Sequence, residues 1–233
     1  MDAPAPLRIL AAGDLHGSQR GADWLYRQAA ALQPDLVLFL GDFVTGGPLA
    51  FCVEVLRELR MLEAPCFVIP GNWDPREVTV HMDEQAYDGL RNLHKASAYV
   101  GGYHFAGLGG SIPTPGGKSP LESPDDGFAE PLAARLPADV WVLHNPLRDY
   151  RDSATAGGNV GSTSLRALYD EQAVDGTAPL LVVSGHIHEA RGIERGGPDD
   201  ATLFVNPGPL SQLNAALITI AGRRAEAELV DGE

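Results

Sequence analysis

Short apolar runs alternate with amphipathic stretches through the first third of the chain. The apolar runs cover residues 7–12, 36–40 and 66–69, and each has the length and composition of a buried strand. Between them, residues 18–32 and 48–62 place their apolar positions at helical spacing. Continuous apolar strands separated by helices indicate a sheet that is covered on both faces.

The remainder of the chain is less regular. Residues 98–108 predict two short strands broken by glycines, whereas residues 109–131 are rich in Gly, Pro and Ser and show no periodicity. A loop of that length in a compact domain is usually functional or mobile. Further strands are predicted at 140–143, 180–183, 202–205, 215–220 and 225–230, the last three as a meander, and a helix at 162–169. Because no linker divides the chain, we expect one domain spanning residues 1–233.

Composition narrows the class of protein. The chain has 233 residues, 44% of them hydrophobic and 21% charged, which suits a globular domain with a large core. The N-terminal residues lack a basic region and the apolar runs are too short to span a membrane, so we expect a cytoplasmic protein without membrane contacts. Cys52 and Cys66 show no metal-ligand spacing and are predicted to lie in the core.

The charge of the chain restricts its partners. A formal net charge of −14 disfavours non-specific binding to nucleic acid, which depends on Lys and Arg neutralising phosphates. A small phosphorylated substrate is still compatible with this charge if bound metals make the site locally positive. The oligomeric state leaves no readable signature in the sequence.

Polar side chains gather directly after five of the predicted strands. They form the segments Asp14-Leu15-His16, Gly41-Asp42, Gly71-Asn72-Trp73-Asp74, His144-Asn145 and His186-Ile187-His188. In α/β sheets, ligands bind in the crevice beyond the carboxyl ends of the strands. We therefore expect these segments to build one site.

The donor atoms of these segments indicate metal binding. The candidate ligands are oxygen and imidazole donors without a thiolate: Asp14, His16, Asp42, Asn72, His144, His186 and His188. Such a set suits Mn, Fe, Zn, Co or Ni better than Ca or Mg. It is too large for one ion and sufficient for two ions that share a bridging carboxylate. Two such metals can hold a phosphoryl group and activate a water molecule.

Each of these residues also has a structural interpretation. Asp14, His16 and Asp42 are compatible with polar turns, Asn72 with a loop-stabilising amide, and His144 with an ordinary core or surface residue. The segment Asp74-Pro75-Arg76-Glu77 matches a helix N-cap, a proline at the first helical position and a capping box, so Asp74 is not assigned to the metals. Outside the motifs, His81, His94 and His104 are interpreted as ordinary residues.

Two arginines follow His144 closely, in a loop expected to border the site. Arg148 or Arg151 could clamp a phosphate, because a guanidinium group suits bidentate phosphate contact. The alternative is a salt bridge with Asp149 or Asp152.

The motifs taken in order resemble the calcineurin-like metallophosphoesterase superfamily. The resemblance rests on Asp-x-His, Gly-Asp, Gly-Asn-x-Asp, His and Gly-His-x-His, and spans Gly13 to Pro209. Asn206-Pro207-Gly208-Pro209 is similar to the Asn-Pro-Gly-Ser segment that follows in bacterial and archaeal members. The resemblance implies a four-layer α/β/β/α sandwich.

The resemblance also implies the roles of the site residues. Asp14, His16 and His188 would hold one divalent metal, manganese foremost, and Asn72, His144 and His186 the other, with Asp42 bridging both. Asp42, Asn72 and His144 are also the expected catalytic residues. The implied reaction is hydrolysis of a phosphate ester by in-line attack of metal-bound hydroxide.

Trp73 departs from the family pattern. Many members have a histidine there, which is thought to protonate the leaving group, and tryptophan cannot exchange a proton at neutral pH. We therefore expect slow turnover of esters with poor leaving groups, and phosphodiesters are favoured over monoesters. The alternatives are a binding scaffold with a decayed site, which should have lost at least one ligand, and a regulatory protein that senses a metal or nucleotide.

Overall fold

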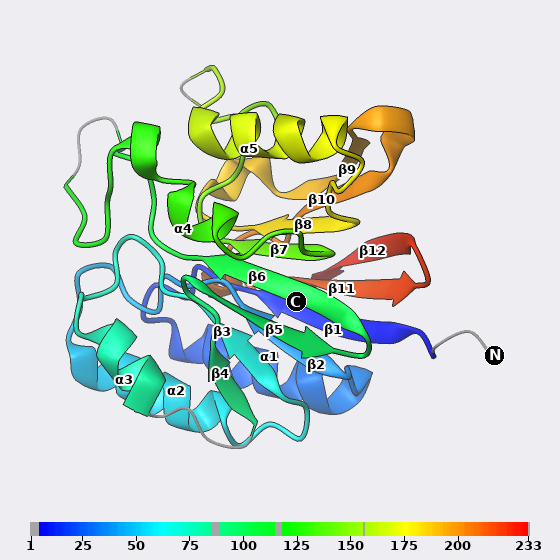
Figure 1. Ribbon diagram of the computed structural model, residues 1–233. Helices are drawn as coiled ribbons and strands as arrows, with labels where there is room; N and C mark the ends of the chain where they lie inside the picture. The colour runs from blue at the N-terminus through cyan, green and yellow to red at the C-terminus, as the bar shows by residue number, and fades with distance from the viewer. Residues whose placement is uncertain (1–4, 85–88, 115–117, 156, 233) are drawn as a thin grey trace.

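The computed structural model describes residues 5–84, 89–114, 118–155 and 157–232, and in it two sheets pack face to face (Figure 1). The first sheet runs in the order β12 (Arg224–Asp231), β11 (Asn214–Ala221), β1 (Leu7–Ala12), β2 (Leu36–Phe39), β3 (Cys66–Val68) and β4 (Leu90–Asn92). The second runs in the order β5 (Ala96–Val100), β6 (Tyr103–Leu108), β7 (Val140–Leu143), β8 (Leu181–Ser184), β10 (Thr202–Asn206) and β9 (Gly192–Gly196).

Helices cover the outer face of each sheet. The first sheet carries α1 (Gln19–Leu32), α2 (Leu49–Leu59) and α3 (Val78–Glu84), and the second carries α4 (Glu130–Ala133) and α5 (Thr163–Val174) (Figure 1). The result is a four-layer α/β/β/α sandwich, so the predicted fold class is confirmed.

Each sheet is buried on both faces, which explains the continuous apolar runs. Along β1, Ile9 joins the cluster between the sheets, whereas its neighbour Leu10 joins the cluster under α1 and α2. On the other sheet, Val142 faces the central cluster and Trp141 packs under α5 beside Tyr169. Alternate side chains of a strand point to opposite faces, so both must be apolar here. Cys52 and Cys66 are buried with free thiols, as predicted.

Parallel strands lie at the centre of each sheet. In the first, β1, β2, β3 and β4 are parallel, and the antiparallel hairpin β11–β12 adds to β1. In the second, β6, β7, β8 and β10 are parallel, with β5 and β9 antiparallel at the two edges. The predicted meander of the last three strands is therefore wrong, because β10 pairs with β8 in one sheet while β11 pairs with β1 in the other.

Several elements were not predicted. The missed elements are α3, β4, α4 and β9, and α5 continues five residues past the predicted end to Val174. Their apolar patterns are weak: β9, for example, is Gly-Ile-Glu-Arg-Gly and lies at a sheet edge. None of the helices in the described ranges is long and apolar enough to cross a membrane.

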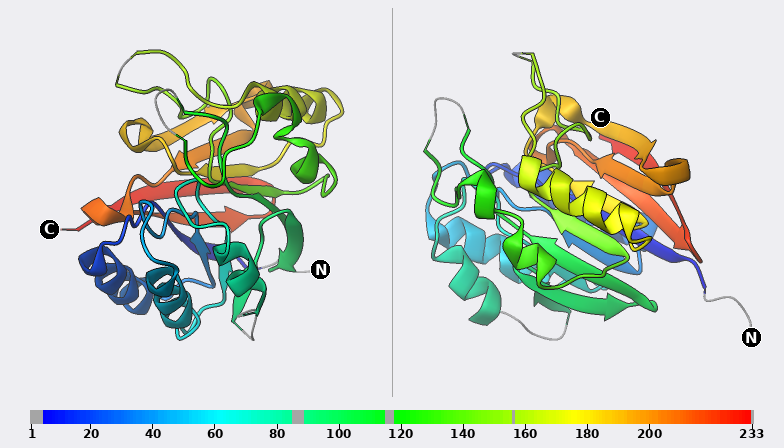
Figure 2. Two further views of the ribbon diagram at one scale, coloured as in Figure 1. Left: turned by 90° about the vertical axis from the view of Figure 1, so that its left-hand side faces the viewer. Right: turned by 45° about the horizontal axis from the view of Figure 1, so that its top comes forward.

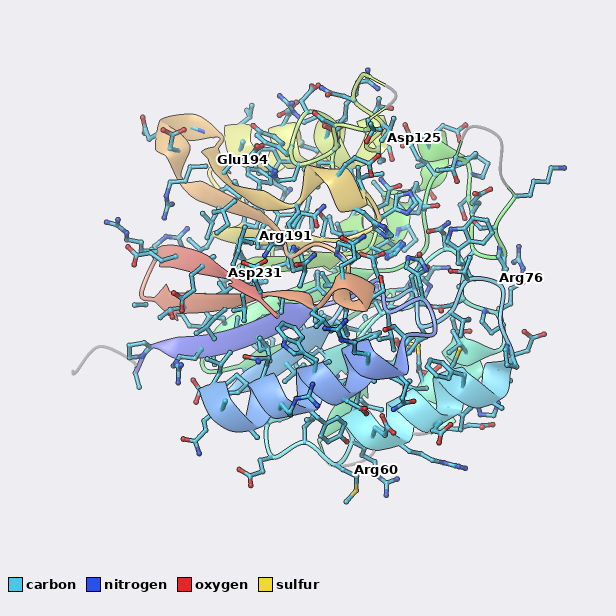
Figure 3. The ribbon with its side chains drawn as sticks, turned by 180° about the vertical axis from the view of Figure 1, so that it is seen from behind. Arg60, Arg76, Asp125, Arg191, Glu194 and Asp231 are labelled. Atoms are coloured by element: carbon cyan, nitrogen blue, oxygen red, sulfur yellow. The ribbon has the colours of Figure 1, made fainter. Side chains whose placement is uncertain are left out.

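Asp125, which lies between β6 and α4, caps the first turn of α5. The carboxylate of Asp125 (labelled in Figure 3) accepts hydrogen bonds from the amides of Thr163 and Ser164, at 3.0 and 3.2 Å, and from the hydroxyls of Ser162 and Thr163. Partial burial raises the pKa of Asp125, but these hydrogen bonds outweigh it and lower the pKa to about 2. The ionised carboxylate therefore stabilises the first turn of α5.

We expect Asp125→Ala to lower the free energy of unfolding by about 1 kcal/mol, the usual cost of losing a helix cap. In a chain of this size that corresponds to a decrease in Tm of about 3 °C. Because the folded pKa lies below the unfolded value, the contribution is complete above about pH 4 and disappears as the pH falls towards 2. Thermal unfolding between about pH 7 and pH 2.5 tests this, with the exposed neighbour Asp126→Ala as control; equal Tm values for the two variants at pH 7 would contradict it.

Candidate metal centre

The polar segments identified in the sequence meet at one edge of the sandwich. They lie on the loops that follow β1, β2, β3, β7 and β8. The left panel of Figure 2 looks onto this edge, where loops from both sheets gather. The carboxyl ends of the parallel strands therefore bring all seven candidate ligands to the same region, across both sheets.

Asp14, His16 and His188 form the first group of donors. One ligand atom from each lies within 4.8 Å of the others. The Nε2 atoms of His16 and His188 are 3.1 Å apart, and the Nε2 atom of His188 is 3.6 Å from a carboxylate oxygen of Asp14. The other ring nitrogen of His16 lies 2.7 Å from the hydroxyl of Thr45, which holds the ring in place.

Asp42, His144 and His186 form the second group, again within 4.8 Å of one another. Asn72 completes it, because its Oδ1 atom is 2.9 Å from the Nε2 atom of His144. The rings of His144 and His186 lie beside each other with centroids 5.0 Å apart.

Asp42 lies between the two groups. Its Oδ2 atom is 3.8 Å from the Nε2 atom of His16 in the first group and 3.6 Å from that of His144 in the second. Its other oxygen accepts a hydrogen bond of 2.9 Å from the amide of Trp73, which orients the carboxylate. A single carboxylate thus faces both groups.

The hydrogen bonds of His144 leave the second group with ligand atoms that suit a cation. The Nδ1 atom of His144 lies 2.7 Å from the carbonyl oxygen of Leu40, which can only accept, so Nδ1 carries the proton. Burial lowers the pKa of His144, and its neutral ring presents an unprotonated Nε2. That atom faces the carbonyl oxygen of Asn72 and the carboxyl group of Asp42, so a ring nitrogen, an amide oxygen and, once Asp42 has lost its proton, a carboxylate oxygen converge. A divalent cation matches this donor set.

Electrostatics differ between the residues of the site. Burial, with the charges of Asp74 and Asp14, raises the pKa of Asp42 well above its usual value. Burial also raises the pKa of Asp14, but the hydrogen bond from His188 and the nearby histidines outweigh it, so that pKa is lowered overall. The same hydrogen bond raises the pKa of His188, whereas burial lowers the pKa of His186 to about 3.

We expect metal binding to release protons and to tighten as the pH rises. Because the pKa values of Asp42 and His188 are raised, the metal-free protein keeps protons at these positions to higher pH than ordinary Asp and His side chains do, and a cation must displace them. Titration calorimetry with Mn²⁺ in buffers of different ionisation enthalpy measures the number of protons released. The Asp42→Asn variant should release fewer protons on binding Mn²⁺. An affinity for Mn²⁺ that is the same at pH 6 and pH 8 would contradict the expectation.

The backbone of the ligand loops adopts an unusual conformation. Asp14, His16, Asp42 and His186 all have positive φ, between 50° and 67°. Such conformations cost of order 1 kcal/mol or more in non-glycine residues and concentrate at functional sites. The loops of Asp42 and Gly71 also approach so closely that only glycine fits at position 71, because a Cβ atom there would lie 2.0 Å from the Asp42 carboxylate. The local structure is thus shaped to aim side chains rather than to minimise strain.

The predicted capping role of Asp74 is wrong. Asp74 is fully buried, and α3 begins only at Val78. Its carboxylate instead accepts hydrogen bonds from the amides of Gly71 at 2.8 Å, Asp42 at 3.0 Å and Val44 at 3.3 Å. Burial raises the pKa of Asp74 to about 7, against the opposing effect of these amides. Asp74 therefore ties the loop that carries Asp42 to the loop that carries Asn72.

The loop of Arg148 and Arg151 supports the turn that carries His188. The guanidinium group of Arg151 donates to the carbonyl oxygens of Ala190 and Arg191, at 2.9 and 2.6 Å, and pairs with Glu194 at 3.5 Å. The alternative of a salt bridge with Asp149 or Asp152 is therefore wrong for Arg151, whose partner is Glu194. Arg148 is exposed.

Arg191 ties the same turn to the end of the chain. It pairs with Asp231 at 2.8 Å, and the two side chains lie together on the face shown in Figure 3. The arginine also donates to the carbonyl oxygen of Pro207 at 3.1 Å, within the Asn-Pro-Gly-Pro segment. In that segment Asn206 donates to the carbonyl oxygen of Ile187 at 2.9 Å, so this motif positions the segment between His186 and His188.

The structure adds supporting residues that the sequence did not indicate. They are Thr45 beside His16, the carbonyl of Leu40 beside His144, Ser119 beside Asn72, and Glu122 beside Ser119. Asp74 also supports the site, and its place in the Gly-Asn-x-Asp motif was a sequence signal that these residues lack. Ser119 and Glu122 lie in the aperiodic loop, where no spacing marks them.

The sandwich and the two groups of donors define the class of metal-dependent phosphoesterases. The family model of the calcineurin-like phosphoesterases matches residues 7–190. The chain therefore belongs to the calcineurin-like phosphoesterase family, which confirms the resemblance noted in its motifs. No curated protein matches the chain significantly in sequence.

Solved structures share the fold at low sequence identity. The TT1561 protein of Thermus thermophilus is 20% identical with a TM-score of 0.70, covering 95% of this chain and 98% of that one. An archaeal phosphodiesterase is 14% identical with a TM-score of 0.55, covering 96% and 100%. GAP50, described as the anchor in the inner membrane complex of Plasmodium, is 13% identical with a TM-score of 0.58, covering 97% and 84%. At these identities the likeness concerns the fold alone.

Proposed function

We propose that the protein is a two-metal phosphodiesterase that hydrolyses a small phosphorylated substrate. The observation that carries this proposal is the position of Asp42, whose carboxylate faces His16 on one side and His144 on the other. One ion at each group, with Asp42 shared, would use every donor of the site. Manganese is the first choice, and Fe, Zn, Ni and Co have the same preference for oxygen and imidazole ligands.

The residues of the site would divide the work as follows. Asp14, His16 and His188 would hold one ion, and Asn72, His144 and His186 the other. When bound, the two ions would polarise the phosphoryl oxygens and lower the pKa of a water molecule, which then serves as the nucleophile. The protein's own contribution is orientation: the Leu40 carbonyl fixes the tautomer of His144, and the Trp73 amide fixes the Asp42 carboxylate.

The test is hydrolysis of bis-p-nitrophenyl phosphate by chelated protein before and after addition of Mn²⁺. We expect no cleavage without metal and cleavage after its addition, with a slower reaction on the p-nitrophenyl monoester. The absence of cleavage with Mn, Fe, Zn, Co and Ni alike would overturn the proposal.

Preference for diesters rests on Trp73. Its backbone amide orients Asp42, but its indole cannot donate a proton to a leaving group at neutral pH. Esters of poor leaving groups need that proton most, and general acid help is typically worth about 10²-fold or more. We expect Trp73→His to raise the rate on phenyl phosphate at least about tenfold, with a smaller gain on p-nitrophenyl phosphate. Trp73→Phe serves as the control, since it keeps the backbone bond; equal gains in the two variants would contradict a general acid.

The alternative is a scaffold or a metal or nucleotide sensor of the same fold. GAP50, described as an anchor, shares this fold, so the fold is compatible with a role other than catalysis. The complete set of donors opposes a scaffold, because a site kept only for its shape has no need of convergent metal ligands. Tight binding of a nucleotide without turnover would favour the sensor.

A further inference from the structure

Two described parts of the loop after β6, residues 109–114 and 118–123, lie against the segment that carries Asn72. The amide of Leu121 donates to the carbonyl oxygen of Asn72 at 3.1 Å, and the amide of Ser111 donates to the carbonyl oxygen of Leu121, also at 3.1 Å. On the other side, the amide of Ile112 donates to the side chain of Asn145, next to His144, at 3.3 Å. The loop thereby places Ser119, which is only 9% exposed, against the fully buried side chain of Asn72.

A directed chain of hydrogen bonds runs from Asn72 into this loop. The side-chain amide nitrogen of Asn72 donates to the hydroxyl of Ser119 at 2.9 Å. That hydroxyl donates to a carboxylate oxygen of Glu122 at 2.8 Å. The hydroxyl of Thr114 donates to the same oxygen at 2.8 Å, which holds the carboxylate in position.

The direction of this chain determines which atom of Asn72 faces the metal site. A serine hydroxyl has one proton, and the Glu122 carboxylate can only accept it. The oxygen of Ser119 must therefore accept from Asn72, and only the NH₂ end of the amide can donate. The carbonyl oxygen of Asn72 is left facing the Nε2 atom of His144, 2.9 Å away. Without Ser119, the amide could turn over, because its two ends have nearly the same shape.

We propose that Ser119, oriented by Glu122, is a positioning residue that keeps the Asn72 carboxamide oxygen directed at the second metal. This rests on the proposed function only in taking the group of Asp42, Asn72, His144 and His186 as a metal site. It also assigns a purpose to the aperiodic loop, which supplies the support for one ligand of the site.

The first test is calorimetric titration of metal-free protein with Mn²⁺. Loss of a group that orients a metal ligand typically weakens binding about 10- to 100-fold. We expect Ser119→Ala to weaken the binding of one of two Mn²⁺ ions by at least about tenfold and to leave the other unchanged. Ser111→Ala is the matched control, because Ser111 is fully buried in the same loop and its hydroxyl has no hydrogen-bond partner among the described residues. Equal Mn²⁺ affinities for the two variants would overturn the proposal.

The second test separates orientation from simple support of the loop. Glu122→Ala removes the acceptor of the Ser119 hydroxyl, which is then free to point towards Asn72. We expect this variant to bind the same Mn²⁺ ion more weakly. Ser119→Thr keeps the hydroxyl and should retain the wild-type affinity for Mn²⁺. In an Asn72→Asp background both ends of the side chain are oxygen, so Ser119→Ala should reduce the affinity for Mn²⁺ much less than it does in the wild-type protein. An equal loss of Mn²⁺ affinity in the wild-type and Asn72→Asp backgrounds would overturn the proposal.

These readouts do not depend on turnover. If no phosphate ester is hydrolysed but the pattern of Mn²⁺ affinities is found, the proposed function fails and the role of Ser119 stands. If esters are hydrolysed and Ser119→Ala binds both ions as the wild type does, the role of Ser119 fails alone. Thermal unfolding of the metal-free variants shows that each is folded before titration.

Discussion

Substitution of Asp42 by alanine is expected to lower kcat/KM for a phosphodiester by at least about 10³-fold, equivalent to about 4 kcal/mol of transition-state stabilisation. The Asp42 carboxylate faces both groups of donors: its Oδ2 atom lies 3.8 Å from the Nε2 atom of His16 and 3.6 Å from that of His144. The expected loss is large because, in the proposed two-metal site, Asp42 would be a ligand of both metals, each of which could stabilise charge on the phosphoryl group by several kcal/mol.

The measurement is steady-state hydrolysis of bis-p-nitrophenyl phosphate with saturating Mn²⁺, together with the number of Mn²⁺ ions bound per chain. Asp42→Asn is the matched control, since its amide oxygen can still accept from Trp73 while the negative charge is lost. We expect Asp42→Asn to be nearly as inactive as Asp42→Ala. Wild-type activity in Asp42→Asn would show that the carboxylate charge is not required and would remove the shared-ligand interpretation.

Substitution of Asp74 by alanine is expected to destabilise the protein by at least about 3 kcal/mol and to reduce activity as well. The Asp74 carboxylate is fully buried and accepts from the amides of Gly71, Asp42 and Val44. Removing it leaves three backbone donors without a partner, and a buried donor left unpaired costs roughly 1–3 kcal/mol. Activity should fall because the loops of Asp42 and Asn72 are no longer tied together.

Urea unfolding of the metal-free protein measures the first effect, and Mn²⁺ affinity measures the second. Asp74→Asn retains one oxygen acceptor, so its loss of stability should lie between those of the wild type and Asp74→Ala. Glu77→Ala provides a control for the helix-cap interpretation, because Glu77 would be the acidic residue of the capping box. If Asp74→Ala and Glu77→Ala each lower the free energy of unfolding by about 1 kcal/mol, Asp74 acts as a helix cap. That result would contradict its role in joining the two loops.

Much of the fold followed from local pattern. The central strands are apolar on both faces because each sheet lies between another sheet and a helical layer, so β1, β2, β7 and β8 were visible as continuous runs. The edge elements were not: β4 has an exposed arginine in the middle of three residues, and β9 begins and ends with glycine. Edge strands are stabilised by their neighbours more than by their own composition.

The partners of strands were harder to predict than the strands themselves. The β10 and β11 strands are separated by only a few residues, yet they belong to different sheets. The segment between them passes from β10 to the Asn-Pro-Gly-Pro turn, where the amide of Leu210 donates to the carbonyl oxygen of Gly13 at 2.8 Å. Nothing in the apolar pattern distinguishes this crossing from the hairpin that joins β11 to β12.

For the site, the sequence by itself determined the chemical inventory. The seven candidate ligands follow predicted strand ends, and parallel strands bring their carboxyl ends to one edge of a sheet, so the sequence places them together: Asp14, His16, Asp42, Asn72, His144, His186 and His188. Only the tertiary structure decided how these side chains are held. The tie through Asp74 and the chain from Asn72 through Ser119 to Glu122 join segments far apart in sequence, and hydrogen bonds between such segments depend on distances and directions that no local pattern encodes.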